Sequence, residues 1–294
     1  MNVSSPNKGG CLLRIQALHQ SFKSAELRLA DYVLEQPSDV LDLTIHDLEE
    51  KSGSSYATVI RFCKKVGFAG FKEFKASLAE DLEQGEDQDF VTTGFPIDLN
   101  DSVEAIIQKT FSQSAKILDD TQKMLNPEVL DTVAQKLVDA REVLFIGTGT
   151  SGMIARYAYT RFMRVGFHCS SETDATLYKV KTSCMDEQDV LFAISGSGRS
   201  AGVVDAALLA SEKGVSVISL TDFAISPLTR TSDLNLFTTP RNASLFLEMD
   251  IPLILGQIAI LDILFSCCCQ KMGLKAVDLY HETKSAADRE KITK

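Results

Sequence analysis

Apolar side chains in the N-terminal quarter of the chain recur every three or four positions, which is the period of an amphipathic helix. Leucine, alanine and valine follow this spacing over 27–34, after Ser24 as the expected N-cap, and Pro37 then interrupts the pattern. The preceding segment, Leu12 to Phe22, is also amphipathic. This part of the chain is therefore predicted to form helices that pack through their apolar faces.

Two further helices are separated by a short turn that contains a glycine. Thr44 has the position of an N-cap, and Asp47 follows three residues later as a capping box whose short carboxylate suits the return bond less well than glutamate. Gly53 suits the left-handed residue that ends such a helix, and Ser55 is the expected cap of a second helix over 56–66. This spacing is typical of a helix-turn-helix unit that binds DNA, and equally of a small helical bundle with solvated polar faces.

The second of these helices has an apolar face and a polar face. Val59, Cys63 and Val66 share the face that should pack inward. The polar face and the residues that flank it offer donors for the bases and phosphates of DNA. These candidate DNA contacts are Ser55, Tyr56, Thr58, Arg61, Lys64, Lys65 and Lys72. Lys64 and Lys72 are also readily explained as solvated surface charges.

The segment 84–101 separates the helical region from a part of the chain with a different pattern. It is acidic, contains two glycines and Pro96, and has little helical periodicity, as interdomain linkers do. A chain of 294 residues is long enough for two domains. We therefore predict an all-helical domain over 1–83, a linker over 84–101 and a second domain over 102–294.

Short apolar runs alternate with helical stretches in the second domain, after two helices predicted over 102–118 and 127–140. Such alternation predicts an α/β fold with a doubly wound parallel sheet covered by helices on both faces. The predicted strands are Val143 to Ile146, Phe167 to Ser170, Val190 to Ile194, Val215 to Leu220 and Leu234 to Thr238.

Loops rich in glycine and hydroxyl side chains follow the first and third strands. Gly-Thr-Gly-Thr-Ser-Gly occupies 147–152, and Ser-Gly-Ser-Gly-Arg-Ser occupies 195–200, each directly before a predicted helix. Backbone N–H groups at a helix start attract anions, and glycines allow a ligand close to the backbone. Since ligands of such sheets bind at the carboxyl ends of the strands, both loops are expected to face one phosphate-binding crevice.

The first loop also fits a nucleotide-binding pattern. Gly147-x-Gly149-x-x-Gly152 matches the dinucleotide fingerprint, and Glu172 or Asp174 has about the spacing of its acidic residue. A nicotinamide enzyme is therefore an alternative, although it leaves the hydroxyl-rich second loop unexplained. Tight turns without any ligand are a further explanation for either loop taken singly.

Composition limits which partners the chain could bind and in which compartment it could act. The formal net charge of -10 confines any DNA contact to a local basic patch. The seven cysteines include no Cys-x-x-Cys pair and fit reduced thiols of a cytoplasmic protein without a metal or a cofactor. No secretory signal pattern is seen at the start of the chain. The apolar segment 251–269 approaches the length of a membrane span, but Gln257 and Asp262 interrupt it, so we expect a buried or interface helix and no membrane contact.

These motifs together resemble a known family of regulators. Residues 144–152 with 195–200 resemble the sugar isomerase, or SIS, domain, a doubly wound fold that binds phosphosugars. The segment 44–75, which contains Ser-Tyr-Ala-Thr-Val-Ile-Arg-Phe-Cys-Lys-Lys-Val-Gly-Phe, is similar to the helix-turn-helix of RpiR-type bacterial transcriptional regulators. The resemblance covers nearly the whole chain. It implies double-stranded operator DNA and a phosphosugar effector as partners of a homodimer or homotetramer.

The resemblance also implies roles for individual residues of the second domain. Arg199 stands where the isomerases often have glutamate, and it can bind phosphate or extend into solvent. Glu248 resembles the isomerase glutamate that moves a proton between sugar carbons, so a sugar-phosphate isomerase is the alternative to a sensor. The DNA-binding half favours the sensor, because catalysis would leave it unexplained. The hydroxyls implied in phosphate binding are those of Thr150, Ser151, Ser195, Ser197 and Ser200.

Overall fold

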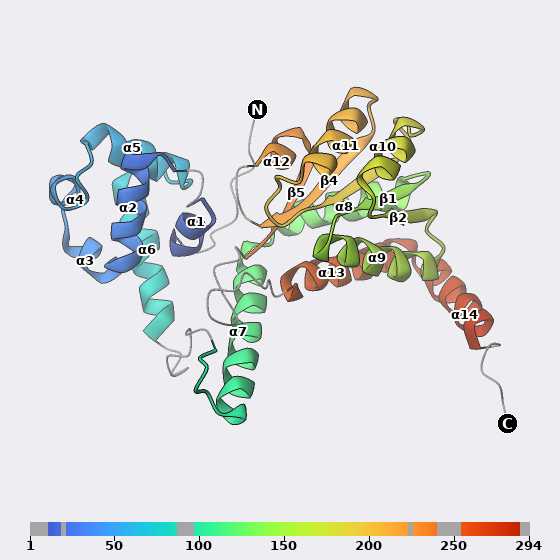
Figure 1. Cartoon of the computed structure of the whole chain (residues 1–294), viewed down its shortest axis with the longest axis horizontal. Helices are drawn as coiled ribbons and strands as arrows, with labels where there is room; N and C mark the ends of the chain where they lie inside the picture. Colours follow the sequence, from blue (N-terminus) through green and yellow to red (C-terminus); the bar gives the residue numbers. More distant parts are fainter. Residues whose placement is uncertain (1–10, 19–21, 87–96, 223–225, 240–253, 289–294) are drawn as a thin grey trace. The chain divides into compact units, whose positions relative to one another are not determined.

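The computed structural model describes residues 11–18, 22–86, 97–222, 226–239 and 254–288 (Figure 1). The described residues form two compact units, one of those up to Leu125 together with Thr239, and the other of those in 126–222, 226–238 and 254–288. The boundaries expected from composition, at 83/84 and 101/102, stay predictions.

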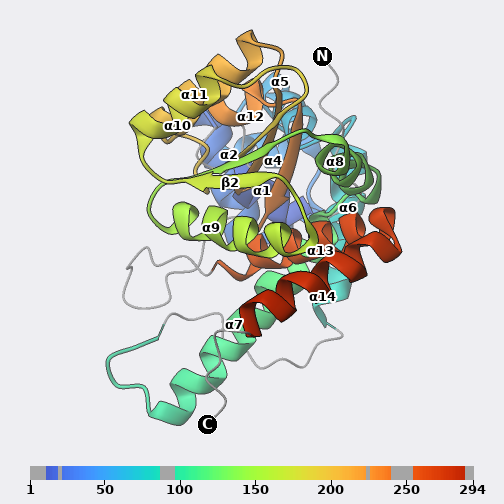
Figure 2. The same cartoon turned by 90° about the vertical axis from the view of Figure 1, so that its right-hand side faces the viewer.

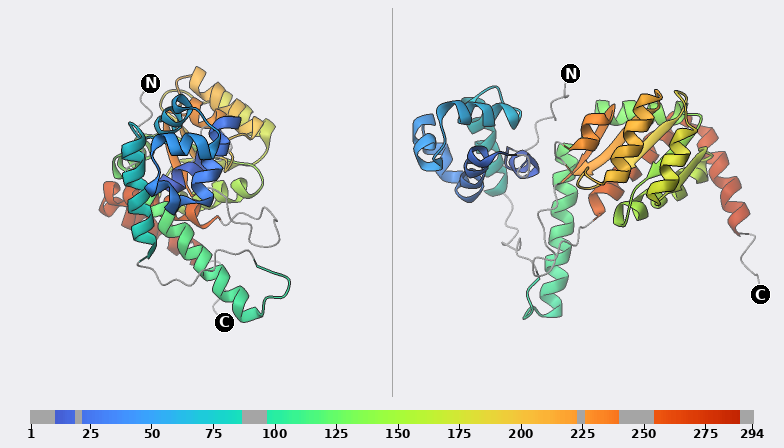
Figure 3. Two further views of the ribbon diagram at one scale, coloured as in Figure 1. Left: turned by 90° about the vertical axis from the view of Figure 1, so that its left-hand side faces the viewer. Right: turned by 45° about the horizontal axis from the view of Figure 1, so that its top comes forward.

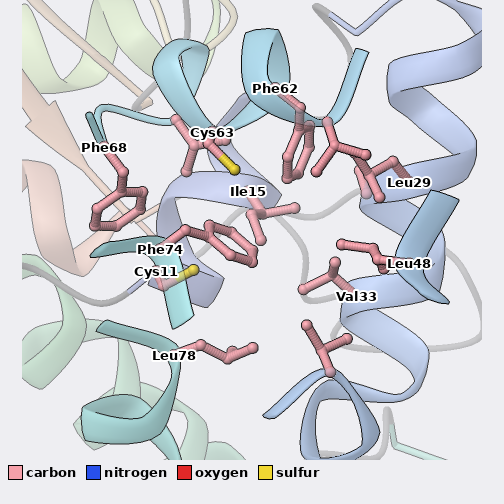
Figure 4. Close-up of a cluster of buried hydrophobic side chains, with 14 of the residues drawn as sticks. Cys11, Ile15, Leu29, Val33, Leu48, Phe62, Cys63, Phe68, Phe74 and Leu78 are labelled. Atoms are coloured by element: carbon pink, nitrogen blue, oxygen red, sulfur yellow. The ribbon is translucent and has the colours of Figure 1, made fainter. Parts of the chain in front are cut away.

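The described secondary structure of the first unit is almost entirely helical, as predicted. Its helices are α1 (Cys11–Leu18), α2 (Ser24–Glu35), α3 (Pro37–Asp42), α4 (Ile45–Ser52), α5 (Tyr56–Lys65), α6 (Phe71–Glu86) and α7 (Val103–Met124). Figure 4 shows the core formed by α1 to α6, where Phe62 and Phe74 contact each other edge to face and Ile15, Leu29 and Leu48 fill the space around them. Side chains from helices far apart in sequence thus form one apolar core.

Local capping explains where α4 and α5 begin and end. The Thr44 hydroxyl accepts the Asp47 N–H, and the Asp47 carboxylate accepts the Thr44 N–H at 2.8 Å. Asp47 thus completes the predicted capping box, and its shorter carboxylate still reaches the N-cap amide. Gly53 is left-handed, with φ of 62°, and Ser55 caps α5, both as predicted.

The start of α2 differs from the prediction. Ser24 is the first helical residue and Lys23 takes the N-cap position. The Glu26 carboxylate accepts the Lys23 N–H at 3.2 Å, so a side chain inside the first turn satisfies this amide. Ser24 is therefore not the N-cap, and the start of α2 is held by the hydrogen bond that Lys23 N–H donates to the Glu26 carboxylate.

The second unit is built on a five-stranded parallel sheet in the order β2-β1-β3-β4-β5. The predicted fold class, a helical part followed by a doubly wound parallel sheet, is confirmed. The strands are β1 (Val143–Ile146), β2 (Cys169–Glu172), β3 (Val190–Ile194), β4 (Ser216–Asp222) and β5 (Leu234–Thr238).

Strand β2 begins two residues after the predicted start at Phe167. Gly166, with φ of 85°, ends the preceding helical turn, and the Phe167 N–H still donates to the carbonyl of Phe162. The Phe167 ring packs edge to face on the Phe162 ring. This contact keeps Phe167 outside the sheet, and Cys169 is the residue that pairs with Val143.

Helices cover both faces of the sheet (Figures 2 and 3). Helices α10, α11 and α12 pack together on one face, and α8, α9 and α13 on the other. Strand side chains alternate accordingly: Leu144 and Ile146 join the core beneath α10 and α11, whereas Phe145 contacts Phe162 of α9. The helices are α8 (Pro127–Asp139), α9 (Thr150–Phe162), η2 (Met163–Val165), α10 (Ala175–Ser183), α11 (Ala201–Glu212), α12 (Pro227–Thr231), α13 (Leu255–Met272) and α14 (Leu274–Asp288).

Helix α13 is the apolar segment that prompted the question of a membrane span. Among the described residues it is the one helix long and apolar enough to cross a bilayer, a test that core helices of soluble proteins also pass. Gln257 is buried, and Asp262 accepts a hydrogen bond from Tyr157 at 2.7 Å and pairs with Arg161. These polar contacts and its packing on α8 and α9 are what a helix of a folded domain shows.

All seven cysteines lie in the described residues and are free. Burial raises the pKa of the Cys63, Cys169 and Cys268 thiols to about 12. Cys184, at the end of α10, is exposed. Cys11, Cys63 and Cys268 are buried packing groups, as predicted, whereas the other four thiols are half-buried or exposed.

Candidate functional site

The first loop connects β1 to α9 through residues 147–149. Gly149 has a φ of 59°, in the left-handed region that favours glycine. A Cβ atom at Gly147 would lie 2.5 Å from the carbonyl oxygen of Ser151, in the first turn of α9. These two glycines allow the chain to pass from the strand into the helix without a longer connection.

The second loop connects β3 to α11 through residues 195–200. The Gly198 N–H donates to the Ser195 carbonyl over 3.0 Å and closes a tight turn. The Ser195 and Ser200 hydroxyls lie 3.1 Å apart, and the Ser197 hydroxyl accepts the Arg199 N–H at 3.3 Å. The loop is thus a compact turn whose polar groups gather at the start of α11.

The two loops lie side by side at one edge of the sheet. Strands β1 and β3 are parallel neighbours, with Ile146 in register with Ala193, so their carboxyl ends meet. Neither α9 nor α11 is capped by the side chain of its N-cap residue, whereas side chains cap α8, α10 and α12. Backbone amides and the positive dipole ends of two helices are therefore presented at the same edge, an arrangement that suits a phosphate group.

The predicted ligand residues of this edge differ in exposure. All those described belong to the two adjacent loops or the helix starts that follow them. Thr150, Ser197 and Arg199 are exposed, Ser200 is half-buried, and Ser151 and Ser195 are buried. Glu248 lies outside the described residues. The structure brings the predicted hydroxyls together, and their role as ligands stays a prediction.

Two residues beside the loops were not singled out from the sequence. Tyr178 of α10 is fully buried, and its hydroxyl lies 2.9 Å from that of Thr148 in the first loop. Thr221 of β4 is buried beside Gly198, and its hydroxyl has no hydrogen-bond partner among the described residues. Tyr178 lies in the middle of a helix and Thr221 near the end of a strand, outside both loop motifs, so only the tertiary structure connects them with the loops.

The acidic residues of the dinucleotide alternative have other partners. Glu172 accepts the N–H groups of Thr173 and Asp174, at 2.9 and 3.2 Å, and pairs with Lys181. Burial acts to raise the pKa of Glu172, but these hydrogen bonds and Lys181 outweigh it and leave the pKa below its usual value. Asp174 caps α10. Both carboxylates thus accept hydrogen bonds from backbone amides between β2 and α10, and neither is left to bind the ribose hydroxyls of a nucleotide. This arrangement favours a phosphate ligand at the loops.

Helix α5 presents part of its polar face to solvent. Ser55, Tyr56, Lys64 and Lys72 are exposed, and the Arg61 side chain is 67% exposed. Val59, Cys63 and Val66 are buried, so the division into two faces is confirmed for the apolar side. Ser55 and Tyr56 lie at the start of α5, the part of a recognition helix that reads base edges, whereas Lys64 lies in its last turn and Lys72 on α6.

Thr58 and Lys65 differ from the expected open positions. Thr58 is only 5% exposed, because its hydroxyl lies 3.0 Å from that of Ser55 and accepts from Arg61 Nη2 at 3.3 Å. Lys65 donates to Glu26 at 2.9 Å and lies over the Phe22 ring. Thr58 therefore orients its neighbours, and Lys65 packs on α2.

Glu26 connects α2 to the candidate DNA-contacting helix. Its carboxylate lies 2.9 Å from Lys65 Nζ and 3.6 Å from Arg61 Nε, and its side chain is 8% exposed. Burial acts to raise its pKa, but hydrogen bonds from Lys65 and the Lys23 amide, with the charges of Lys65 and Arg61, hold the pKa below the usual value. Glu26 and Thr58 thus fix one side of the Arg61 guanidinium while the rest stays exposed.

Comparison with known proteins agrees with the division of the chain into a helix-turn-helix part and a part built on a parallel sheet. A helix-turn-helix domain of the rpiR family matches residues 9–85, and the SIS domain matches residues 136–266. The regulator HexR of Pseudomonas aeruginosa is 33% identical over 264 residues, 90% of each chain. An HTH-type transcriptional regulator of Caldanaerobacter subterraneus is 32% identical and covers 95% of this chain and 97% of its own length. The structure of Vibrio vulnificus NanR complexed with ManNAc-6P is 26% identical, with a TM-score of 0.61, and covers 97% of this chain and 100% of its own.

Proposed function

The chain belongs to the rpiR family of helix-turn-helix transcriptional regulators, and on this premise we propose that a phosphorylated sugar bound at the two loops modulates its binding to operator DNA of a sugar-catabolic pathway. The observation that carries the proposal is the pair of adjacent loops from which α9 and α11 start without side-chain caps. NanR, similar over nearly the whole chain, is described in complex with a phosphosugar. In bacteria such a regulator acts in the cytoplasm, where the DNA is.

The phosphate would be held by backbone amides and short hydroxyl side chains. Amides at the starts of α9 and α11 donate along the two helix dipoles. The exposed Ser197 and Thr150 can reach a ligand without rearrangement of the core, and Arg199 adds a cation that pairs with phosphate in a planar fork. The sugar ring would then lie outside the loops, where its hydroxyls decide which sugar is recognised.

The DNA would be bound by the exposed start of α5. In this proposal the exposed Tyr56 and Arg61 would reach base edges in the major groove, and the exposed Lys64 and Lys72 would neutralise phosphates. A monomer carries one such helix, whereas helix-turn-helix proteins commonly bind two half-sites as dimers. Several apolar side chains of α13, among them Leu255, Ile258 and Ile263, are only half-buried, which supports association of chains through this helix in a homodimer or homotetramer.

An isomerase would need a proton-transferring group in addition to the phosphate site. The candidate, Glu248, lies outside the described residues. The relatives that match most of the chain are named as transcriptional regulators. We therefore assign the site to recognition of the sugar phosphate rather than to its turnover.

Purified full-length protein tests the proposal in three assays. Thermal shift with hexose, pentose and N-acetylhexosamine phosphates should show stabilisation by at least one of them, but not by the corresponding free sugars. That phosphosugar should change binding to DNA from upstream of the gene in a gel shift, and it should be recovered unchanged after incubation. Equal stabilisation by free sugars would contradict the phosphate site, and conversion of the phosphosugar would favour the isomerase.

Ser197 supplies the matched variants for the site. Its side chain is exposed in the second loop, so Ser197→Ala should weaken phosphosugar stabilisation while the melting temperature without ligand stays the same. Ser211, exposed at the other end of α11, is the control, and Ser211→Ala should respond to the phosphosugar like the unaltered protein. An unaltered response of Ser197→Ala would remove this hydroxyl from the site.

A further inference from the structure

Tyr178 connects the first loop with the apolar core beneath α10 and α11. Its side chain is completely buried, in the cluster that contains Leu144, Ile146 and Val203. Its hydroxyl lies 2.9 Å from the Thr148 hydroxyl. A buried phenol therefore ends at the loop that precedes α9.

The same phenol lies against the start of α11. A Cβ atom at Gly202 would be 3.2 Å from the Tyr178 hydroxyl oxygen and 3.4 Å from Cε2 of its ring. It would also lie 2.8 Å from the Ala175 side chain. Glycine at 202 thus allows α10 to approach the first turn of α11, and Tyr178 lies between the starts of two helices that both face the candidate phosphate site.

The bond to Thr148 acts on an otherwise exposed segment. Thr148, Gly149 and Thr150 are all exposed, and Gly149 is in the left-handed region, so the short segment has few packing contacts to hold it. The phenol is held in place by the core around it, so a hydrogen bond to it restricts the exposed residue that makes the bond. Ordering a loop before a ligand arrives removes part of the entropy cost of binding.

We propose that Tyr178 is a positioning residue for the phosphosugar site: its hydroxyl holds Thr148 so that the amides at the start of α9 stay directed at the ligand. The inference rests on the proposed function, because it concerns the same site. Tyr178 touches the loop and not the phosphate. Its effect is expected in ligand affinity, with DNA binding in the absence of ligand unchanged.

The test compares variants that remove one hydroxyl each. The probe is the phosphosugar that stabilises the unaltered protein most in the thermal-shift panel, and its dissociation constant is measured by calorimetry on the full-length protein. Tyr178→Phe and Thr148→Val should each weaken binding about two- to tenfold, the effect of one hydrogen bond. Thr148→Ser, which keeps the hydroxyl, should bind like the unaltered protein.

The double variant separates positioning from direct contact. If the two hydroxyls act only through each other, Tyr178→Phe with Thr148→Val should bind no more weakly than either single variant. Tyr157→Phe is the matched control, because it removes a tyrosine hydrogen bond from α9 to Asp262 of α13, and it should leave affinity unchanged. Melting temperatures of all variants report general destabilisation separately.

Two outcomes would overturn the inference. Tyr178→Phe that binds the phosphosugar like the unaltered protein would show that the phenol does not position the loop. Losses that add in the double variant would show that the hydroxyls act independently. Failure of the unaltered protein to bind any phosphosugar would contradict the proposed function itself and is recognised before any variant is made.

Discussion

The carboxylate of Glu26 shows how a single buried charge organises the candidate DNA-binding surface. It holds Lys65 close to α2 and lies beside Arg61. It also accepts a hydrogen bond from the Lys23 N–H at the start of α2. Removing the charge would leave cations near a desolvated neutral group. Glu26 therefore affects both stability and the orientation of Arg61.

Glu26→Gln should destabilise the helix-turn-helix unit by about 1–2 kcal/mol at pH 7, because charged hydrogen bonds are replaced by neutral ones. The folded-state pKa of Glu26 lies below its usual value of 4.5, so this stabilisation is complete above that pH and is lost as the pH falls through the folded-state pKa. Urea unfolding at pH 7 and pH 3 measures the difference between the two proteins, which should shrink at pH 3. Asp119→Asn, which breaks an exposed pair with Lys123, should change stability by only a few tenths of a kcal/mol (~0.3).

Arg61→Ala should weaken specific operator binding by about 1–3 kcal/mol, because the exposed part of its guanidinium is free to donate to a base. Lys64→Ala is the comparison: a phosphate contact should weaken binding to all sequences alike and lower the salt dependence. Gel-shift or anisotropy titrations at several salt concentrations distinguish the two. Unchanged operator binding of Arg61→Ala would remove it from the interface.

Secondary-structure elements were predictable where local chemistry decides them. Thr44, Gly53 and Ser55 fixed the bounds of α4 and α5, and apolar runs located β1, β3 and β5. The start of β2 was misplaced because a ring contact between Phe162 and Phe167 decides it, and no local pattern records that contact. For the same reason the partner of Thr148 could not be foreseen, since Tyr178 joins the loop only through tertiary packing.

The turn of the second loop depends on glycine at position 198 for two reasons. Its φ is 62°, and a Cβ atom would overlap the Ser226 hydroxyl at the cap of α12. Gly198→Ala should therefore cost about 2–4 kcal/mol and abolish phosphosugar binding. Gly214→Ala meets the left-handed penalty alone, because at φ of 75° its nearest neighbouring atom is 3.9 Å away, and it should cost about 1 kcal/mol. If Gly198→Ala and Gly214→Ala lost equal stability in thermal unfolding, the predicted overlap with Ser226 would be contradicted.

At the scale of the whole molecule, regulation requires that phosphosugar binding and operator binding be thermodynamically coupled. A phosphosugar changes operator affinity only if it binds the free and the DNA-bound protein differently. Thermodynamic linkage then requires operator DNA to change phosphosugar affinity by the same factor. Calorimetric titration of phosphosugar with and without saturating operator, together with DNA titrations with and without phosphosugar, should give equal factors, typically about 5- to 150-fold. Unequal factors would mean that oligomer assembly contributes to the response.

The distribution of thiols has a practical consequence for following such a response. Burial raises the pKa of Cys63, Cys169 and Cys268 to about 12, so they remain protonated and sheltered at neutral pH, whereas Cys184 is exposed at the end of the helix that carries Tyr178. A maleimide dye used in limiting amount will react first at Cys184. Because α10 runs from the carboxyl end of β2 back toward the amino end of β3, Cys184 lies at the sheet edge opposite the two loops, where a fluorescent reporter would not touch the candidate ligand site.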